Sequence, residues 1–149
     1  MTRRRRTAAI VAGIVLIAGA LVGLYRAAAS APEPVKVEEF GRNVRHVASL
    51  AREAALLADL VHGNRVTGNF ARTHRQKLER EVDDEVEKLK APVPQQLDEA
   101  GERARALTST LAETLRNLES HLPEAAFLDK TRGDAARLAD EVAKLEPPK

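Results

Sequence analysis

Four stretches of this sequence repeat apolar residues at alternating steps of three and four, which is the spacing of one face of an α-helix. The stretches cover residues 37–62, 68–90, 94–121 and 124–145. No credible β-strand lies between them. The pattern therefore predicts an all-α fold built from four amphipathic helices.

The residues between the stretches are those that end and begin helices. Gly63 follows the first stretch, where glycine ends a helix without steric strain, and Thr67 or Asn69 is placed to cap the second helix. Proline cannot continue a helix but is favourable as its first residue, as at Pro94 and Pro123. Each connection is short, and short connections force neighbouring helices to run antiparallel.

We therefore predict an antiparallel up-down-up-down four-helix bundle over residues 37–146, with a tail at residues 147–149. Because the chain has no cysteine, packing alone must stabilise the bundle. The alternative is a pair of long hairpins that complete their core only in a dimer, which the alanine-rich face of the first helix would permit. On the second helix the predicted core stripe is Phe70, His74, Leu78, Val82, Val86 and Leu89.

A membrane-type pattern precedes the bundle. Residues 8–25 carry no charge and follow a basic segment, residues 1–7, with four consecutive arginines at 3–6. An apolar helix of that length extends about 27 Å, close to the roughly 30 Å core of a bilayer. Positive charge on its N-terminal side predicts that residues 1–7 stay in the cytoplasm and that the rest of the chain is extracytoplasmic. We expect a single-pass signal anchor in the cytoplasmic membrane, joined to the bundle by a linker at residues 26–36.

The same segment also fits a secretory signal peptide that is removed after about residue 29. Ala27 and Ala29 occupy the small positions of an A-x-A cleavage site. The apolar stretch is longer than is usual for such signals, which favours the uncleaved anchor. In both cases the bundle is exported, and it is periplasmic or secreted if the signal is removed.

Gly19 and Gly23 form a G-x-x-x-G pattern within this apolar segment. Such a pair lets two membrane helices approach closely, so it predicts packing between two copies of the anchor. Small residues are common throughout the segment, so the spacing also arises readily by chance.

Charge and motif content exclude several classes of function. Five of the 24 basic residues lie within the first 26 residues, whereas all 22 acidic residues lie beyond them, so the exported part is slightly acidic. It has no basic patch interleaved with aromatic residues, and we expect no nucleic-acid partner. No G-x-S-x-G turn and no glycine-rich phosphate loop occurs, so we expect no catalysis and no cofactor.

Three histidines are candidates for a metal site. His62 and His121 end the first and third predicted helices, and His74 lies about one turn into the second. In an up-down-up-down bundle these positions share one pole, where imidazoles could bind zinc, copper or iron. The simpler explanation is that the helix dipole favours histidine at a helix C-terminus. A periplasmic metal-binding or metal-stress protein is therefore the alternative function.

The first helix has more leucine than one buried stripe needs. If the bundle cannot cover them all, these leucines form a contact surface for a protein partner or a second copy of the chain. The residues in question are Leu50, Leu56, Leu57 and Leu60. The leading prediction is a membrane-tethered, extracytoplasmic helical-bundle interaction or structural protein that is not an enzyme.

Overall fold

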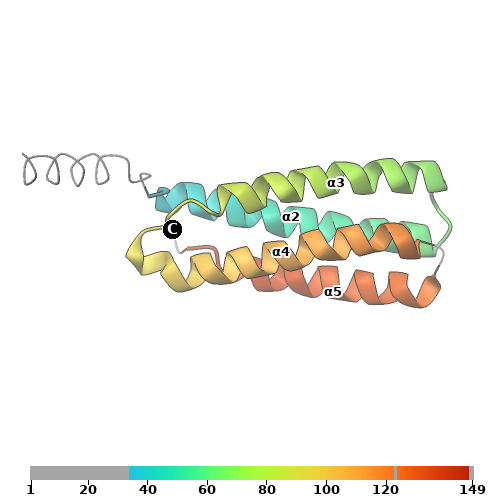
Figure 1. The fold of residues 1–149 in the computed structure, drawn as a ribbon. Helices are drawn as coiled ribbons and strands as arrows, with labels where there is room; N and C mark the ends of the chain where they lie inside the picture. The colour runs from blue at the N-terminus through green and yellow to red at the C-terminus, as the bar shows by residue number, and fades with distance from the viewer. Residues whose placement is uncertain (1–33, 123, 148–149) are drawn as a thin grey trace, which may run out of the picture. The chain divides into compact units, whose positions relative to one another are not determined.

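The computed structural model describes residues 34–122 and 124–147. Helix α2 spans Val37–His62, α3 spans Gly68–Lys88, α4 spans Asp98–His121 and α5 spans Ala125–Ala143. A single 3₁₀ turn, η1 at Gln95–Leu97, leads into α4. All regular structure within these two ranges is helical (Figure 1), so the prediction of an all-α fold with four helices is confirmed.

The helix ends follow the local signals in the sequence. The range predicted for the first helix coincides with α2, and Gly63 is its C-cap. Thr67 caps α3, because its hydroxyl oxygen accepts a hydrogen bond from the Phe70 amide at 3.2 Å. The second and third helices are shorter than predicted around Pro94, since the chain there forms a turn and then η1. Helix α5 continues through Gly133 without a break.

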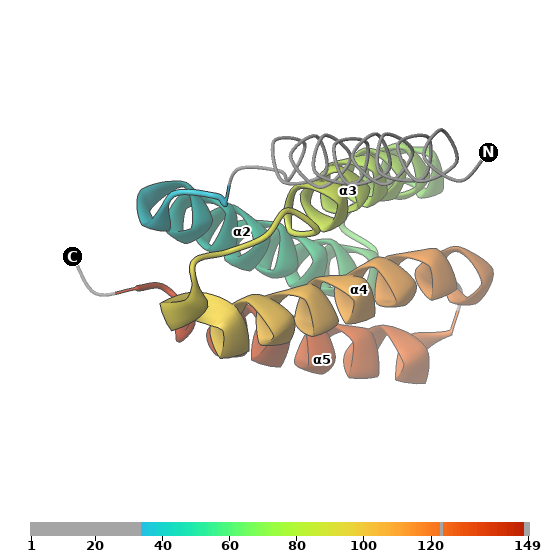
Figure 2. The same ribbon diagram turned by 60° about the vertical axis from the view of Figure 1, so that its left-hand side comes forward.

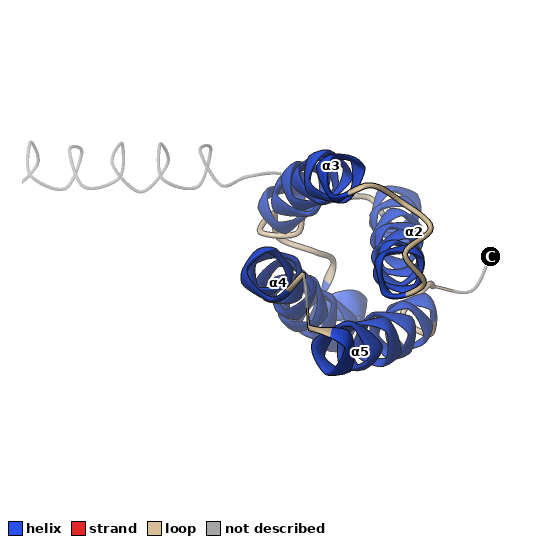
Figure 3. Ribbon diagram, turned by 90° about the vertical axis from the view of Figure 1, so that its right-hand side faces the viewer, coloured by secondary structure: helices blue, strands red, loops and turns tan. Residues whose placement is uncertain are grey.

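Each helix runs back alongside the one before it, as Figures 1 and 2 show. Viewed along its axis, the bundle is a ring in which α2 contacts α3 and α5, and α4 contacts the same two helices (Figure 3). We call the end where α2 and α4 finish and α3 and α5 begin the distal pole. The opposite end, where α2 and α4 begin, is the proximal pole.

The core consists of leucine, valine and alanine with one phenylalanine, Phe40. Helices α2 and α5 pack more closely than any other pair in the described bundle. Small buried residues explain this, because alanine side chains let two helix backbones approach. The buried alanines of these two helices are Ala48, Ala51, Ala54, Ala58, Ala135 and Ala139.

Ion pairs join neighbouring helices at the surface. Arg132 of α5 lies 3.1 Å from Asp59 of α2, and Arg116 of α4 lies 2.7 Å from Asp83 of α3. Exposed pairs of this kind stabilise a fold by at most about 1 kcal/mol each. Apolar burial therefore provides most of the stability, while the pairs favour this arrangement of neighbours.

One glycine is required by packing. A Cβ added at Gly101 of α4 would lie 2.9 Å from Cγ2 of Val93, in the segment that leads from α3 to α4. Apart from its chain neighbours and the adjacent backbone of α5, no atom lies within 4 Å of the corresponding position at Gly133. Gly101 thus allows the connecting segment to pack against α4, whereas Gly133 lies in open space.

No helix in the described ranges is long and apolar enough to cross a membrane. The predicted anchor at residues 8–25, with Gly19 and Gly23, lies outside the described residues. The basic segment 1–7 and most of the linker 26–36 also lie outside them.

Candidate functional site

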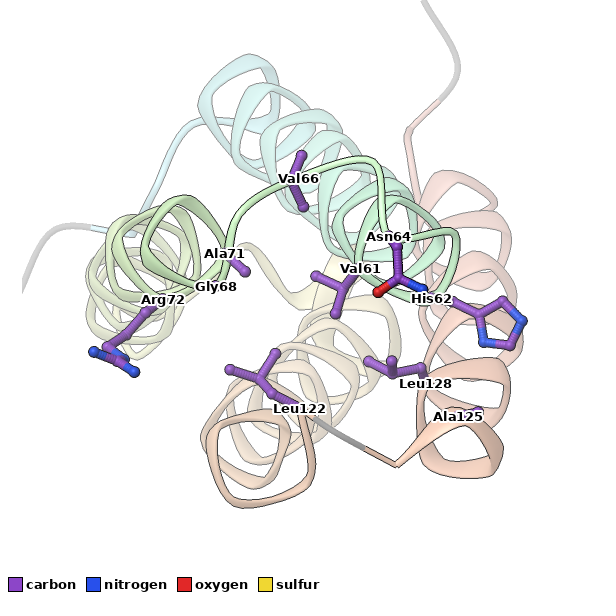
Figure 4. A pocket seen from close by; sticks show the side chains of 10 residues that line it. All are labelled: Val61, His62, Asn64, Val66, Gly68, Ala71, Arg72, Leu122, Ala125 and Leu128. Carbon is purple, nitrogen blue, oxygen red and sulfur yellow. The ribbon is translucent and has the colours of Figure 1, made fainter.

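The four helices leave a cavity of about 400 Å³ at the distal pole, which we call the distal cavity. Figure 4 shows Val61, Leu122 and Leu128 pointing toward one another between the helices, with the Asn64 amide above them. Arg72 and His62 flank the opening on opposite sides in the same view, and both of their side chains point away from it. The remaining lining residues are Val66, Gly68, Ala71 and Ala125.

Local backbone geometry places Asn64 over this cavity. Its φ of 51° lies in the left-handed region, which asparagine tolerates better than most residues. The turn that follows α2 therefore bends back across the pole, and the Arg65 amide donates a hydrogen bond to the Leu60 carbonyl oxygen at 2.9 Å. The cavity combines an apolar floor with polar groups around its opening.

The three predicted metal ligands do not converge. His62 Nε2 lies 4.0 Å from Asp129 of α5, and His74 Nε2 lies 3.0 Å from Glu53 of α2. Within the described part of the chain, no group of three or more metal-binding side chains gathers closely enough to hold an ion. The helix ends do share a pole as predicted, but two of the imidazoles lie at different seams of the bundle.

His121 makes a local contact instead. Its Nδ1 lies 2.8 Å from the Asn117 carbonyl oxygen, which can only accept, so Nδ1 donates this bond. Its ring stacks on Phe127 of α5 with 4.3 Å between centroids. This capping contact at the end of α4 is the simpler role considered for a histidine at that position.

The leucines of the proposed contact surface divide into two groups. Leu50 and Leu57 are buried in the core, so the expectation that they form part of a surface is wrong. Leu60 is half-buried, and Leu56 is 56% exposed. The reason is that α3 and α5 pack on both sides of α2, so together they bury a face of α2 that is wider than one stripe of apolar residues.

A second exposed large apolar side chain lies on the neighbouring helix, α3. Phe70 is 47% exposed, although its place in the periodic stripe predicted burial. Its ring stacks on His74 with 5.4 Å between centroids, and His74 contacts Glu53, which lies one turn from Leu56. We call Glu53, Leu56, Phe70 and His74 the α2–α3 patch.

Two charged residues of α3 lie in the core, and the sequence pattern did not predict them. Arg75 is 2% exposed; its Nη1 donates to Glu79 Oε2 at 2.6 Å and to the Leu115 carbonyl oxygen at 3.5 Å. The apolar residues Ala71, Leu78 and Leu89 share this buried face. The sequence spacing could have predicted this burial. Arg75 lies four residues after Ala71 and Glu85 lies four residues before Leu89, so both lie on the same helix face as these apolar residues.

Glu85 is the second buried charge, at 1% exposure. Its Oε1 accepts a hydrogen bond from Lys88 Nζ at 2.6 Å and lies 2.9 Å from His46 Nδ1 on α2. Hydrogen bonding and attraction by Glu85 raise the pKa of Lys88 above its ordinary 10.5. The other carboxylate oxygen, Oε2, is buried and has no hydrogen-bond partner among the described residues.

No protein-family model, curated protein or solved structure matches this chain. Two surface features of the described bundle are suited to contact another molecule. They are the α2–α3 patch, which exposes large apolar side chains, and the distal cavity, which is recessed and lined by apolar and polar groups.

Proposed function

We propose that this chain is a non-catalytic interaction protein. An N-terminal helix at residues 8–25 tethers it to the cytoplasmic membrane, and the extracytoplasmic bundle contacts a protein partner or a second copy through the α2–α3 patch. The observation that carries this proposal is the exposure of Leu56 and Phe70, because the other large hydrophobic residues of the described chain are buried or half-buried. These two are the exposed large hydrophobic residues of the described chain.

The patch has the composition expected of a small contact site. Removing a leucine or phenylalanine side chain from water is favourable by about 1.5–3 kcal/mol when burial is complete. The Phe70 and His74 rings are stacked, and His74 is held against Glu53 at 3.0 Å, so the apolar surface is positioned before contact. A preorganised patch loses less side-chain entropy when a partner covers it.

Site-specific photo-crosslinking tests the patch. The full chain carries a photo-reactive residue at Leu56 in the living membrane, and the control chain carries it at Ala106, an exposed residue of α4. We expect a discrete product from position 56, at twice the mass of the chain for a second copy or at another mass for a different protein. Equal, diffuse labelling from both positions contradicts the proposal.

Cysteine accessibility tests the location. Because the natural chain has no cysteine, Ser49→Cys at an exposed position of α2 creates a unique thiol. A membrane-impermeant maleimide added to intact cells should label it without lysis. Labelling that requires lysis would show a cytoplasmic bundle and would refute the membrane topology.

A further inference from the structure

The distal cavity has the size and lining of a small-molecule site. Its volume of about 400 Å³ falls within the roughly 300–1,000 Å³ of typical ligand pockets. All four helices or the turns next to them contribute to its lining. Val61, Leu122 and Leu128 point into it and provide apolar contacts for a hydrocarbon group (Figure 4).

The charges around the cavity favour an anion. Arg72 is the charged residue of the lining; the other ionisable residue, His62, faces Asp129 of α5 at 4.0 Å, and no acidic residue is among the described residues that line the cavity. The cavity of about 390 Å³ at the proximal pole differs, because Glu38 and Glu146 line it together with Arg42 and Arg45. Opposite charges balance there, whereas Arg72 has no acidic counterpart among the described residues that line the distal cavity.

Arg72 is available for a ligand. It is exposed, and no carboxylate of the described residues pairs with it. Two other basic residues at this pole have partners: Arg65 pairs with Asp59, and Arg132 pairs with Asp59 and Asp129. Its guanidinium points away from the cavity in Figure 4, and rotation about its flexible side-chain bonds brings it to a ligand head group at the opening.

We propose that the distal cavity binds a small amphiphilic carboxylate. Its hydrocarbon chain packs against Val61, Leu122 and Leu128, and its carboxylate group accepts hydrogen bonds from Arg72 at the opening. This binding activity is separate from the protein contact proposed for the α2–α3 patch, whose exposed residues do not line the cavity.

Titration of the full chain in lipid nanodiscs with octanoate tests this inference. Methyl-resolved NMR should show saturable shifts at Val61, Leu122 and Leu128. Arg72→Gln should weaken binding about fivefold, the effect of losing one exposed charge pair. Arg80→Gln, the same exposed substitution two turns along α3, is the matched control and should change the affinity by less than about twofold.

Two further measurements separate the apolar and anionic contributions. 1-Octanol has the same chain length without the charge, and it should bind at least about fivefold more weakly than octanoate. Ala125→Phe places a large ring at an exposed position of the cavity wall and should reduce octanoate binding while leaving the melting temperature unchanged. The proposal is overturned if the shifts do not saturate, if octanol binds as tightly, or if Arg72→Gln and Arg80→Gln behave alike.

Discussion

The buried carboxylate of Glu85 gives the sharpest test of the energetics of this bundle. We predict that Glu85→Met stabilises the fold. Methionine has a similar length and flexibility, so it can occupy the same space in the core without a charge. The substitution removes a carboxylate that is 1% exposed and has one oxygen without a hydrogen-bond partner among the described residues.

The expected gain in the free energy of unfolding depends on how exposed the two partners of Glu85 are. His46 is 47% exposed and Lys88 is 54% exposed, so both can be solvated when the carboxylate is lost. No buried charge is left without compensation. Replacing a buried ionic group with a well-packed apolar one is often stabilising by about 1–4 kcal/mol, and we expect about 1–2 kcal/mol here because the lost contacts are partly favourable.

Glu79→Met is the matched control, since it changes the same residue type on the same helix. Glu79 is half-buried, but its partner Arg75 is 2% exposed and loses a 2.6 Å contact to a carboxylate. The guanidinium then stays in the core with less compensation. We expect Glu79→Met to destabilise the fold by about 1–3 kcal/mol, below the value for a fully buried pair.

Urea denaturation followed by circular dichroism measures both variants against the natural chain. The expected result is opposite signs, with the midpoint raised for Glu85→Met and lowered for Glu79→Met at equal slopes. Destabilisation of similar size in both variants would refute the reasoning, because it would mean that the exposure of the partners does not determine the sign.

Three other predictions concern helix ends, glycines and pH. Thr67→Ala removes the side-chain acceptor at the start of α3 and should lower the free energy of unfolding by about 1 kcal/mol in urea titrations, whereas Thr67→Asp should retain it. Gly133→Ala should raise the melting temperature, with a gain of about 0.5–1 kcal/mol, while Gly101→Ala should not, because its new methyl group meets a neighbouring side chain at 2.9 Å. Since the folded pKa of Lys88 is raised above 10.5, its pairing with Glu85 stabilises the fold below pH 10.5 and this contribution is lost as the pH rises through the folded value. Alkaline urea titrations should show this loss in the natural chain and a smaller one in Glu85→Gln, and identical profiles would contradict it.

The candidate site was predictable in position but not in chemistry. Chain order and short connections determine that the ends of α2 and α4 share a pole with the starts of α3 and α5. His62 does line the cavity found there. His74 instead faces Glu53, and His121 contacts its own helix, because side-chain direction depends on how each helix is rotated about its axis.

Helix α3 shows most clearly that the spacing of apolar residues does not determine which helix face is buried. Its apolar residues are few, and two stripes share Leu78 and Val82: one continues with Phe70 and the other with Ala71. The structure buries the second stripe and exposes Phe70. Hydrogen bonds offset the cost of burying the Arg75 charge. Its contact with Glu79 lies within α3, whereas its contact with the Leu115 carbonyl oxygen comes from α4.

The amino-acid sequence alone determined the number of helices, their approximate ends and the all-α class, because these follow from local spacing and from proline, glycine and capping residues. Only the tertiary structure decided which leucines of α2 are covered, which face of α3 is buried and where a cavity remains. Those features depend on contacts between helices that are distant in the chain, and the two overlapping stripes of α3 are compatible with more than one set of such contacts.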